Sequence, residues 1–354
     1  MQFNDIRHCR VTPAQGRIRI GEREYDLEES LRLNAPFGTI PVQVLADALK
    51  PYSLISGGEC QPQAAILLYQ ASGCLEALIH YFPLLRILDD RQKVEFHARL
   101  QQLAGSYELR VVMKGLPEDA PFSDVPEGVR ILAAGHILEV FFFRPEILVR
   151  FFKSRRSFWV YPSLKAYQAA GGAGGGSYHP VLRCIRMYMQ RFFEGFYGAM
   201  PGQAPFLHEF GHMLEHFNSR RGLMLHGTGV LPGMLESDGS LYNPEARTLF
   251  LEGKRMEKER YQAWSSSAGA GRGPMPLGSP YVFQSDSEFI AGYFEMFFRN
   301  PDAFADKNIT LYRAFERLFG WDPRQAWEQD FNAYVRSNQL AYESGKPLKT
   351  TGLT

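Results

Sequence analysis

The chain has 354 residues, with 39 Lys and Arg against 38 Asp and Glu and a net charge of +1. That length excludes a peptide or mini-protein and suits two or three domains, or one large catalytic domain with an appendage. The balanced charge excludes wrapping of nucleic acid and a polybasic membrane patch. A hydrophobic content of 45% excludes an intrinsically disordered chain, so we expect a folded protein with a sizeable core.

The N-terminal part of the chain shows one hairpin pattern and two helical patterns. Residues 17–27 alternate polar and apolar about Gly21, which predicts a small hairpin. Apolar residues at helical spacing then predict helices over residues 40–50 and 63–82, separated by a turn-rich stretch.

From about residue 88 the sequence favours helices with little strand. One β-rich run, RSFWVYP at 156–162, predicts a strand, and we expect it at a sheet edge where an extended peptide can pair with it. The Gly-rich run 169–177 predicts a flexible loop, and the polar tail after about 337 is expected to fray. Helices are predicted at 89–103, 129–143, 180–200, 204–217, 247–264, 287–300 and 309–320, with irregular segments at about 218–245 and 265–280.

An HExxH motif, His208-Glu209-Phe210-Gly211-His212, lies within an apolar helical pattern. Residues four apart share one helix face, so both imidazoles can bind one zinc ion at roughly 2.0–2.1 Å. Glu209 lies about 100° round the helix, where it can act as general base on a water activated by the metal. The alternative is a chance pair of histidines with local hydrogen bonds. We favour the metal because two unligated imidazoles and a carboxylate are costly to bury in this run.

Two further residues of this helix call for comment. Gly211 costs roughly 1 kcal/mol relative to Ala inside a helix, which points to close approach by another element or by substrate, unless it is simply tolerated. His216 shares the face of His212, yet it lies eight residues, roughly 12 Å along the axis, from His208. One ion cannot bind both, so we expect His216 to have a structural or supporting role.

The third ligand decides the subclass of metal site. Glu215 and Asn218 stand where metzincins need Gly and His, which excludes that subclass. Glu288 is favoured among the downstream carboxylates because it opens an apolar helix that would enter the core. The alternative is a capping box, in which Glu288 reaches back to the Ser285 amide, and both remain open. The downstream candidates are Glu236, Glu245, Glu252, Glu257, Glu259, Glu288 and Glu295.

Three segments together resemble the MtfA (Mlc titration factor A) family of zinc peptidases, and are similar in the same places to the catalytic domain of anthrax lethal factor. They are HEFGHMLEHF at 208–217, YVFQSDSEFIAGYFEMFFRNPDAF at 281–304 and LYRAFERLFGWDP at 311–323. Upstream, VRILAAGHILEV and RRSFWVYP look like a helix and a strand of that family, so the likeness covers about residues 80–330. Glu215 departs from the family's Asp, and residues 219–243 replace a shorter loop.

The resemblance implies His208, His212 and Glu288 as ligands of one Zn²⁺ and Glu209 as the base. It places Tyr281 where the family's phenol stabilises the oxyanion, although an aromatic packed on the core is the alternative. Glu295 matches a family carboxylate that can orient a ligand histidine, unless it is a solvated helix residue.

The implied fold is α+β, a mainly helical zincin-like metallopeptidase domain with a small mixed sheet. We expect it to span residues 80–336, between an N-terminal extension of unknown role (1–79) and a polar C-terminal tail (337–354).

We therefore expect a zinc metallopeptidase that acts on a peptide or protein substrate. The alternative is a zinc-containing binding protein that sequesters a transcriptional regulator or other protein partner, with weak or no peptidase activity. An effector protease that acts on another cell's proteins ranks below both. The four cysteines form no CxxC pair, and the N-terminus lacks an apolar signal core. We expect a cytoplasmic location, with no nucleic acid or membrane as partner.

Overall fold

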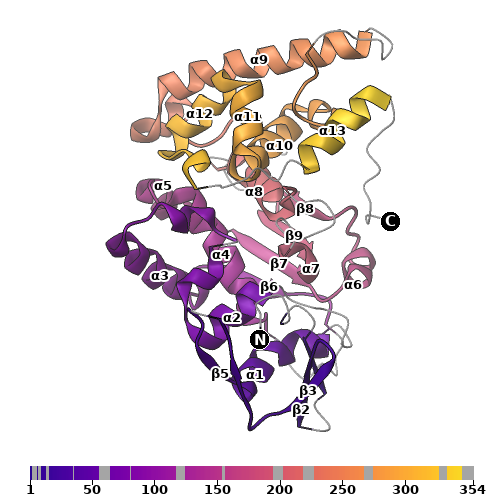
Figure 1. Ribbon diagram of the computed structural model, residues 1–354. Helices are drawn as coiled ribbons and strands as arrows, with labels where there is room; N and C mark the ends of the chain where they lie inside the picture. The colour runs from indigo at the N-terminus through magenta and orange to yellow at the C-terminus, as the bar shows by residue number, and fades with distance from the viewer. Residues whose placement is uncertain are drawn as a thin grey trace. The chain divides into compact units, whose positions relative to one another are not determined.

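The computed structural model has an α+β fold, mainly helical with small sheets (Figure 1). The chain divides into two compact units: Met1–Glu139, Ser157–Ala173 and Met187–Phe193 form the first, and Val140–Arg156, Gly174–Arg186 and Glu194–Thr354 the second. The expected boundary at residue 79 therefore lies inside the first unit. The structure describes residues 1, 6, 9–12, 16–34, 36–55, 64–79, 81–116, 124–153, 156–193, 202–217, 227–266, 274–326 and 333–344.

The first unit begins with short strands and continues with helices. The predicted hairpin is confirmed: β2 and β3 pair antiparallel about Gly21, whose φ of 61° suits a residue without a Cβ. The first unit contains β1 (Cys9–Thr12), β2 (Arg17–Ile20), β3 (Arg23–Asp26), β4 (Ser30–Arg32), β5 (Thr39–Pro41), α1 (Val42–Ile55), α2 (Ala64–Ser72), η3 (Leu75–Leu78), η4 (Pro83–Arg86), α3 (Asp90–Ala104), β6 (Arg110–Met113), β7 (Ser157–Tyr161), α6 (Leu164–Ala169) and α7 (Met189–Phe192).

The single helix predicted over 63–82 is wrong in its length. Helix α2 ends at Ser72, and the short helix η3 starts at Leu75. Gly73 lies between them with a φ of 68°, a left-handed conformation that stops a helix.

The second unit holds most of the remaining helices. Helix α10 packs against α8, η6 and α11, and α12 packs against α9. Phe297 of α10 stacks on Phe315 of α12 with ring centroids 5.5 Å apart. The second unit contains α5 (Pro145–Lys153), β8 (Gly176–His179), α8 (Pro205–Glu215), η5 (Glu236–Leu241), α9 (Pro244–Ser266), η6 (Pro280–Phe283), α10 (Asp286–Arg299), α11 (Pro301–Lys307), α12 (Ile309–Phe319), η7 (Pro323–Gln325) and α13 (Ala333–Ser344). Helix α4 (Glu127–Phe141) and strand β9 (Cys184–Tyr188) continue from one unit into the other.

Gly211 lies at a close contact between α8 and α10. A Cβ at this position would be 2.9 Å from the Cα of Ala291 and 3.5 Å from the Cβ atoms of Ala291 and Phe294. The predicted close approach is therefore made by a helix. It brings the backbone of the HExxH helix next to the helix that carries Glu288.

The helix predicted over 180–200 is wrong for residues 180–188, and residues 194–200 lie outside the described residues. Strand β9 occupies its middle, and the short helix α7 follows directly. Cys184, Ile185, Met187 and Tyr188 are all buried, so the strand is covered on both faces. An apolar run of this kind does not show the alternation of a half-exposed strand, which is why the sequence pattern suggested a helix.

Two expectations about strands also need correction. The strand at 156–162 exists as β7, but it is not an edge strand, because β6 pairs with it on one side and β9 neighbours it on the other. The outer strand beside β9 is β8, which begins at Gly176 and so takes up the end of the predicted flexible loop 169–177.

The described part of the predicted C-terminal tail, residues 337–344, is helical. Helix α13 continues to Ser344, past the expected start of the tail at 337. The side chains of Asn338 and Tyr342 are fully buried, and the Tyr342 hydroxyl donates a hydrogen bond to the Gly278 carbonyl. A few buried side chains anchor this polar helix to the second unit.

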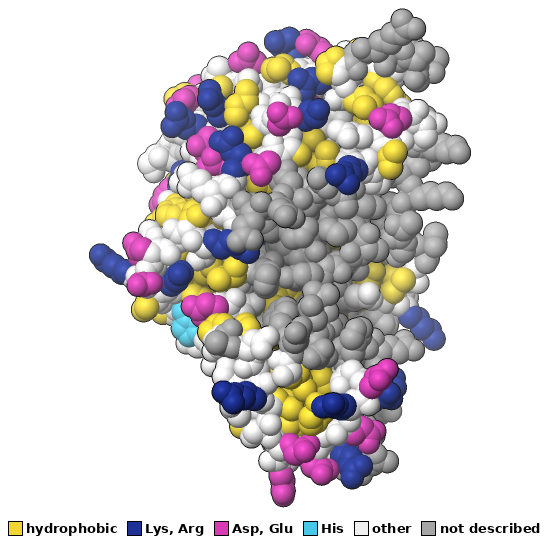
Figure 2. Space-filling view, viewed as in Figure 1, with side chains coloured by type: hydrophobic (Ala, Val, Ile, Leu, Met, Phe, Trp, Pro, Cys, Tyr) yellow, Lys and Arg dark blue, Asp and Glu magenta, His cyan; other side chains and the backbone are white. Residues whose placement is uncertain are grey.

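The described surface carries both signs of charge. Figure 2 shows Lys and Arg side chains interspersed with Asp and Glu on the face in view, in keeping with the balanced composition. None of the helices among the described residues is long and apolar enough to cross a membrane.

Candidate metal centre

Helix α8 presents the two motif histidines from one face. Pro205 occupies its first turn, where the missing N–H is not needed. Phe206, Leu207 and Phe210 are buried and fix the rotation of the helix. The side chains of His208 and His212 keep exposed fractions of 17% and 12%, so they are sheltered but still reachable from solvent.

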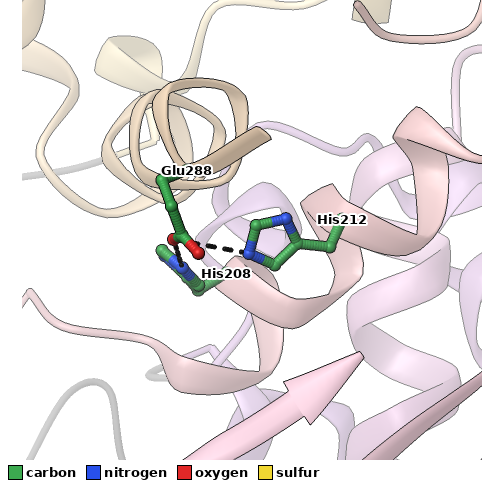
Figure 3. Close-up of side chains that lie close together, drawn as sticks. All are labelled: His208, His212 and Glu288. Atoms are coloured by element: carbon green, nitrogen blue, oxygen red, sulfur yellow. Dashed lines mark hydrogen bonds and ion pairs between the residues drawn. The ribbon is translucent and has the colours of Figure 1, made fainter. Parts of the chain in front are cut away.

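Glu288 reaches both histidines from the first turn of α10. Its Oε2 lies 3.1 Å from His208 Nε2 and 3.5 Å from His212 Nε2 (Figure 3). Ser285 does cap α10, since its Oγ accepts the Glu288 N–H at 3.1 Å. The Ser285 cap and the contact between Glu288 and the histidines therefore coexist: the backbone of Glu288 is used in the cap, and its carboxylate faces α8.

These three side chains could hold a metal ion. One potential ligand atom from each of His208, His212 and Glu288 lies within 4.8 Å of the others. Among the described residues, they are the one group of His, Cys, Asp and Glu side chains that meets this condition. Two imidazole nitrogens with one carboxylate oxygen form a donor set that suits zinc, so the residues fit the ion that the motif implies.

Carboxylates and imidazoles shift one another's pKa values in the site. Burial alone would lower the pKa of His208, but hydrogen bonds with Glu288 and Glu295 raise it to about 10. Burial opposes ionisation of Glu288, and the hydrogen bonds from His208 and His212 outweigh it and lower the Glu288 pKa well below its usual range. In the metal-free protein a proton on His208 balances part of the negative charge.

Glu209 points to the same cavity from the neighbouring position of α8. Its side chain is 9% exposed, and burial raises its pKa although the charges of His208 and His212 act in the opposite direction. A backbone hydrogen bond from Tyr178 of β8 holds the carboxylate. A raised pKa is the direction that favours a carboxylate as proton acceptor and donor near neutral pH.

Tyr281 lines the cavity next to the histidines and is partly exposed to solvent. It lies in η6, is 50% exposed, and its ring centroid is 6.4 Å from that of His208. Burial raises its pKa, and both the charge of Glu288 and a hydrogen bond with it add to the effect. The phenol therefore stays protonated and can donate a hydrogen bond.

The structure brings Glu295 to the metal centre and keeps His216 from the ligand set. Glu295 is 2% exposed and lies 3.3 Å from His208 Nδ1, the nitrogen turned away from Glu288. It also accepts the N–H of Ala204, just before α8. His216 Nδ1 hydrogen-bonds to the His212 carbonyl at 3.0 Å, and its ring packs on Tyr178 with centroids 5.1 Å apart. His216 thus occupies the C-cap position of α8.

A cavity of about 560 Å³ within the second unit is lined by Glu209, His212 and Glu288. Strand β8 lines it through Gly176, Ser177 and Tyr178, and the segment 227–229 lines another part. Sequence reasoning missed both this strand and Ser287, which touches His212. The sequence offered one signal for Ser287, its position directly before the predicted ligand Glu288.

Comparison with known proteins leaves the family open. No protein-family model matches the chain, and no curated protein matches it significantly. The site must therefore be interpreted from its own geometry.

Proposed function

We propose that this protein is a zinc-dependent peptidase with a zincin-like catalytic domain. The observation that carries the proposal is the convergence of His208, His212 and Glu288 beside a buried Glu209 and an open cavity. Three protein ligands, rather than the four of a structural site, favour catalysis. This argues against the alternative of a binding protein with a purely structural zinc.

The bound zinc would supply Lewis acidity, polarising the scissile carbonyl and making a water molecule more acidic. Glu209 accepts a proton from that water as the oxygen–carbon bond forms. Tyr281 donates a hydrogen bond to the developing oxyanion. Glu209 then passes the proton to the leaving nitrogen as the carbon–nitrogen bond breaks, which releases an amine and a carboxylic acid.

Strand β8 offers a place for the substrate. It lies at the outer end of the strand order β6-β7-β9-β8 and lines the cavity. An extended peptide can add to such a strand through main-chain hydrogen bonds. We propose that β8 takes the role first expected of β7. Among the described residues, Cys9, Cys74 and Cys184 form no disulfide, which fits the proposed cytoplasmic location.

The test is digestion of a peptide library by the purified protein, with and without a chelator, together with metal analysis. Glu209→Gln should retain zinc and lose about 10²–10⁴-fold or more in kcat, because the amide cannot accept the proton. Tyr281→Phe should lower kcat with little change in KM. Glu252→Gln, on an exposed position of α9, is the matched control and should cleave normally. Full activity of the Glu209 variant would overturn the proposal.

A further inference from the structure

We infer that Ser287 and Glu215 are positioning residues that hold His212 in the tautomer required for metal binding. The inference rests on the proposed zinc centre and deepens it. His212 Nδ1 lies 2.9 Å from Ser287 Oγ, and the Ser287 hydroxyl donates to Glu215 Oε2. The three groups form a chain that runs from the α8 terminus through α10 to the imidazole.

The direction of each hydrogen bond follows from the end of the chain. The Ser287 hydroxyl donates to Glu215 Oε2, and a hydroxyl has a single hydrogen to give. Toward His212, Ser287 can therefore only accept. His212 then carries a proton on Nδ1, which leaves Nε2, 3.5 Å from Glu288 Oε2, as the nitrogen that an ion can take. That is the tautomer that can bind an ion together with His208.

The carboxylate of Glu215 is itself fixed from the other side. It is 2% exposed, and its Oε1 accepts the N–H of Gly229 at 2.6 Å. Thr228 Oγ1 donates to the Glu215 carbonyl at 3.0 Å. A Cβ on Gly227 would lie 2.1 Å from Glu215 Cδ, so the backbone of this segment closes directly over the carboxylate. A carboxylate held this firmly can orient a hydroxyl.

The two motif histidines are thus supported in different ways. His208 Nδ1 contacts the Glu295 carboxylate directly at 3.3 Å. His212 reaches a carboxylate through a serine. Both arrangements place the proton on Nδ1 and direct Nε2 toward Glu288, which is the shared requirement of the site.

Variants at the two positions have distinct expected effects. Ser287→Ala removes the acceptor for Nδ1, and Ser287→Thr keeps the hydroxyl. Glu215→Gln has one acceptor oxygen, which the Gly229 N–H occupies, so its amide group must donate to Ser287. The hydroxyl is then free to donate to Nδ1, which favours the Nε2–H tautomer that cannot bind metal.

The experiment measures zinc affinity by competition with a chromophoric chelator, and the His212 tautomer in the metal-free protein by long-range ¹H–¹⁵N NMR at pH about 8.5. Ser287→Ala and Glu215→Gln should weaken zinc binding by about 10–100-fold, whereas Ser287→Thr should stay within about threefold of wild type. Glu257→Gln is the matched control: this buried carboxylate contacts Tyr293 and Asn308 but neither histidine, so zinc affinity should not change.

Unchanged zinc affinity in folded Ser287→Ala and Glu215→Gln would overturn the inference. An Nε2–H tautomer of His212 in the wild-type protein would also overturn it, and this measurement needs no variant to fold. A wild-type protein that binds no zinc would refute the proposed function, while the tautomer would still decide the role of Ser287. Zinc binding without peptide cleavage would refute the proposed reaction alone.

Discussion

Replacement of Gly211 by Ala tests whether the packing of α8 on α10 sets the metal centre. The added Cβ would lie 2.9 Å from the Cα of Ala291. Carbon atoms in contact prefer about 3.5–4.0 Å, so the helices must separate by roughly 0.6–1 Å. The contacted atom belongs to the backbone of α10, so it cannot move aside by a rotamer change as the end of a side chain can.

Two opposing effects set the change in stability. Alanine is favoured over glycine inside a helix by about 1 kcal/mol. Overpacking of a close interface costs about 1–3 kcal/mol. Gly211→Ala should therefore lower the free energy of unfolding by about 0–2 kcal/mol, whereas helix propensity alone would raise it. The free energy of unfolding, measured in urea, reports this difference.

The same separation should weaken the metal site. Glu288 comes from α10, while His208 and His212 come from α8, and ligand distances tolerate only about ±0.2 Å. We expect zinc affinity to fall by about tenfold or more, in the range of other changes to the surroundings of a metal site. Chelator competition measures it.

The control for propensity is the pair Glu252→Ala and Glu252→Gly, at an exposed position in the middle of α9. The alanine variant should be more stable by about 1 kcal/mol. If Gly211→Ala gains the same amount and binds zinc as tightly as wild type, the helices are not packed closely enough to control the site, and the reasoning is refuted.

Two further predictions concern the buried carboxylate of Glu295 and the partly buried carboxylate of Asp322. Glu295→Ala removes the carboxylate that contacts His208 Nδ1. Zinc binding, measured by chelator competition, should weaken by about 10–100-fold. Wild-type zinc affinity in this variant would contradict the role of Glu295 in orienting His208. Asp322 accepts from Tyr312 and Arg324; burial opposes its ionisation, but hydrogen bonds from Arg324 and Tyr312 lower its pKa below 3.8. Asp322→Asn should therefore cost about 1–2 kcal/mol of unfolding free energy at pH 7. The difference from wild type should narrow as the pH falls from 3.8 toward the lower pKa of the folded state, because the Asp322 carboxylate of the unfolded chain then binds a proton that the folded protein does not; a gap that is constant with pH would contradict this.

The local half of the metal centre could be predicted because a helix fixes it. Two residues four apart share a face whatever surrounds them, so HExxH alone places His208, His212 and Glu209. The sequence left two functions open for Glu288, as a cap partner and as a ligand. Packing of α8 on α10 decides between them, since it turns the carboxylate toward the histidines and leaves the cap to Ser285.

The strands show where sequence patterns fail. The buried residues of β9 lie on both faces, so no alternation marked it as a strand. The residues of β8, Gly176–His179, are all half-buried and follow a glycine run, which favoured a loop. Both strands exist because neighbouring strands satisfy their backbone groups, a condition that no short window of sequence contains.

The carboxylates around the histidines bear on which imidazole nitrogen would be available to a metal ion. Glu215, Glu288 and Glu295 surround two imidazoles, and a bound dication would offset much of their negative charge. Without fixed protons, however, the same carboxylates could draw a proton to either nitrogen of each ring. The contacts at Nδ1 of both rings hold a proton on that nitrogen. The helix motif therefore brings the imidazoles to the right place, and the buried acids decide which nitrogen is free to bind.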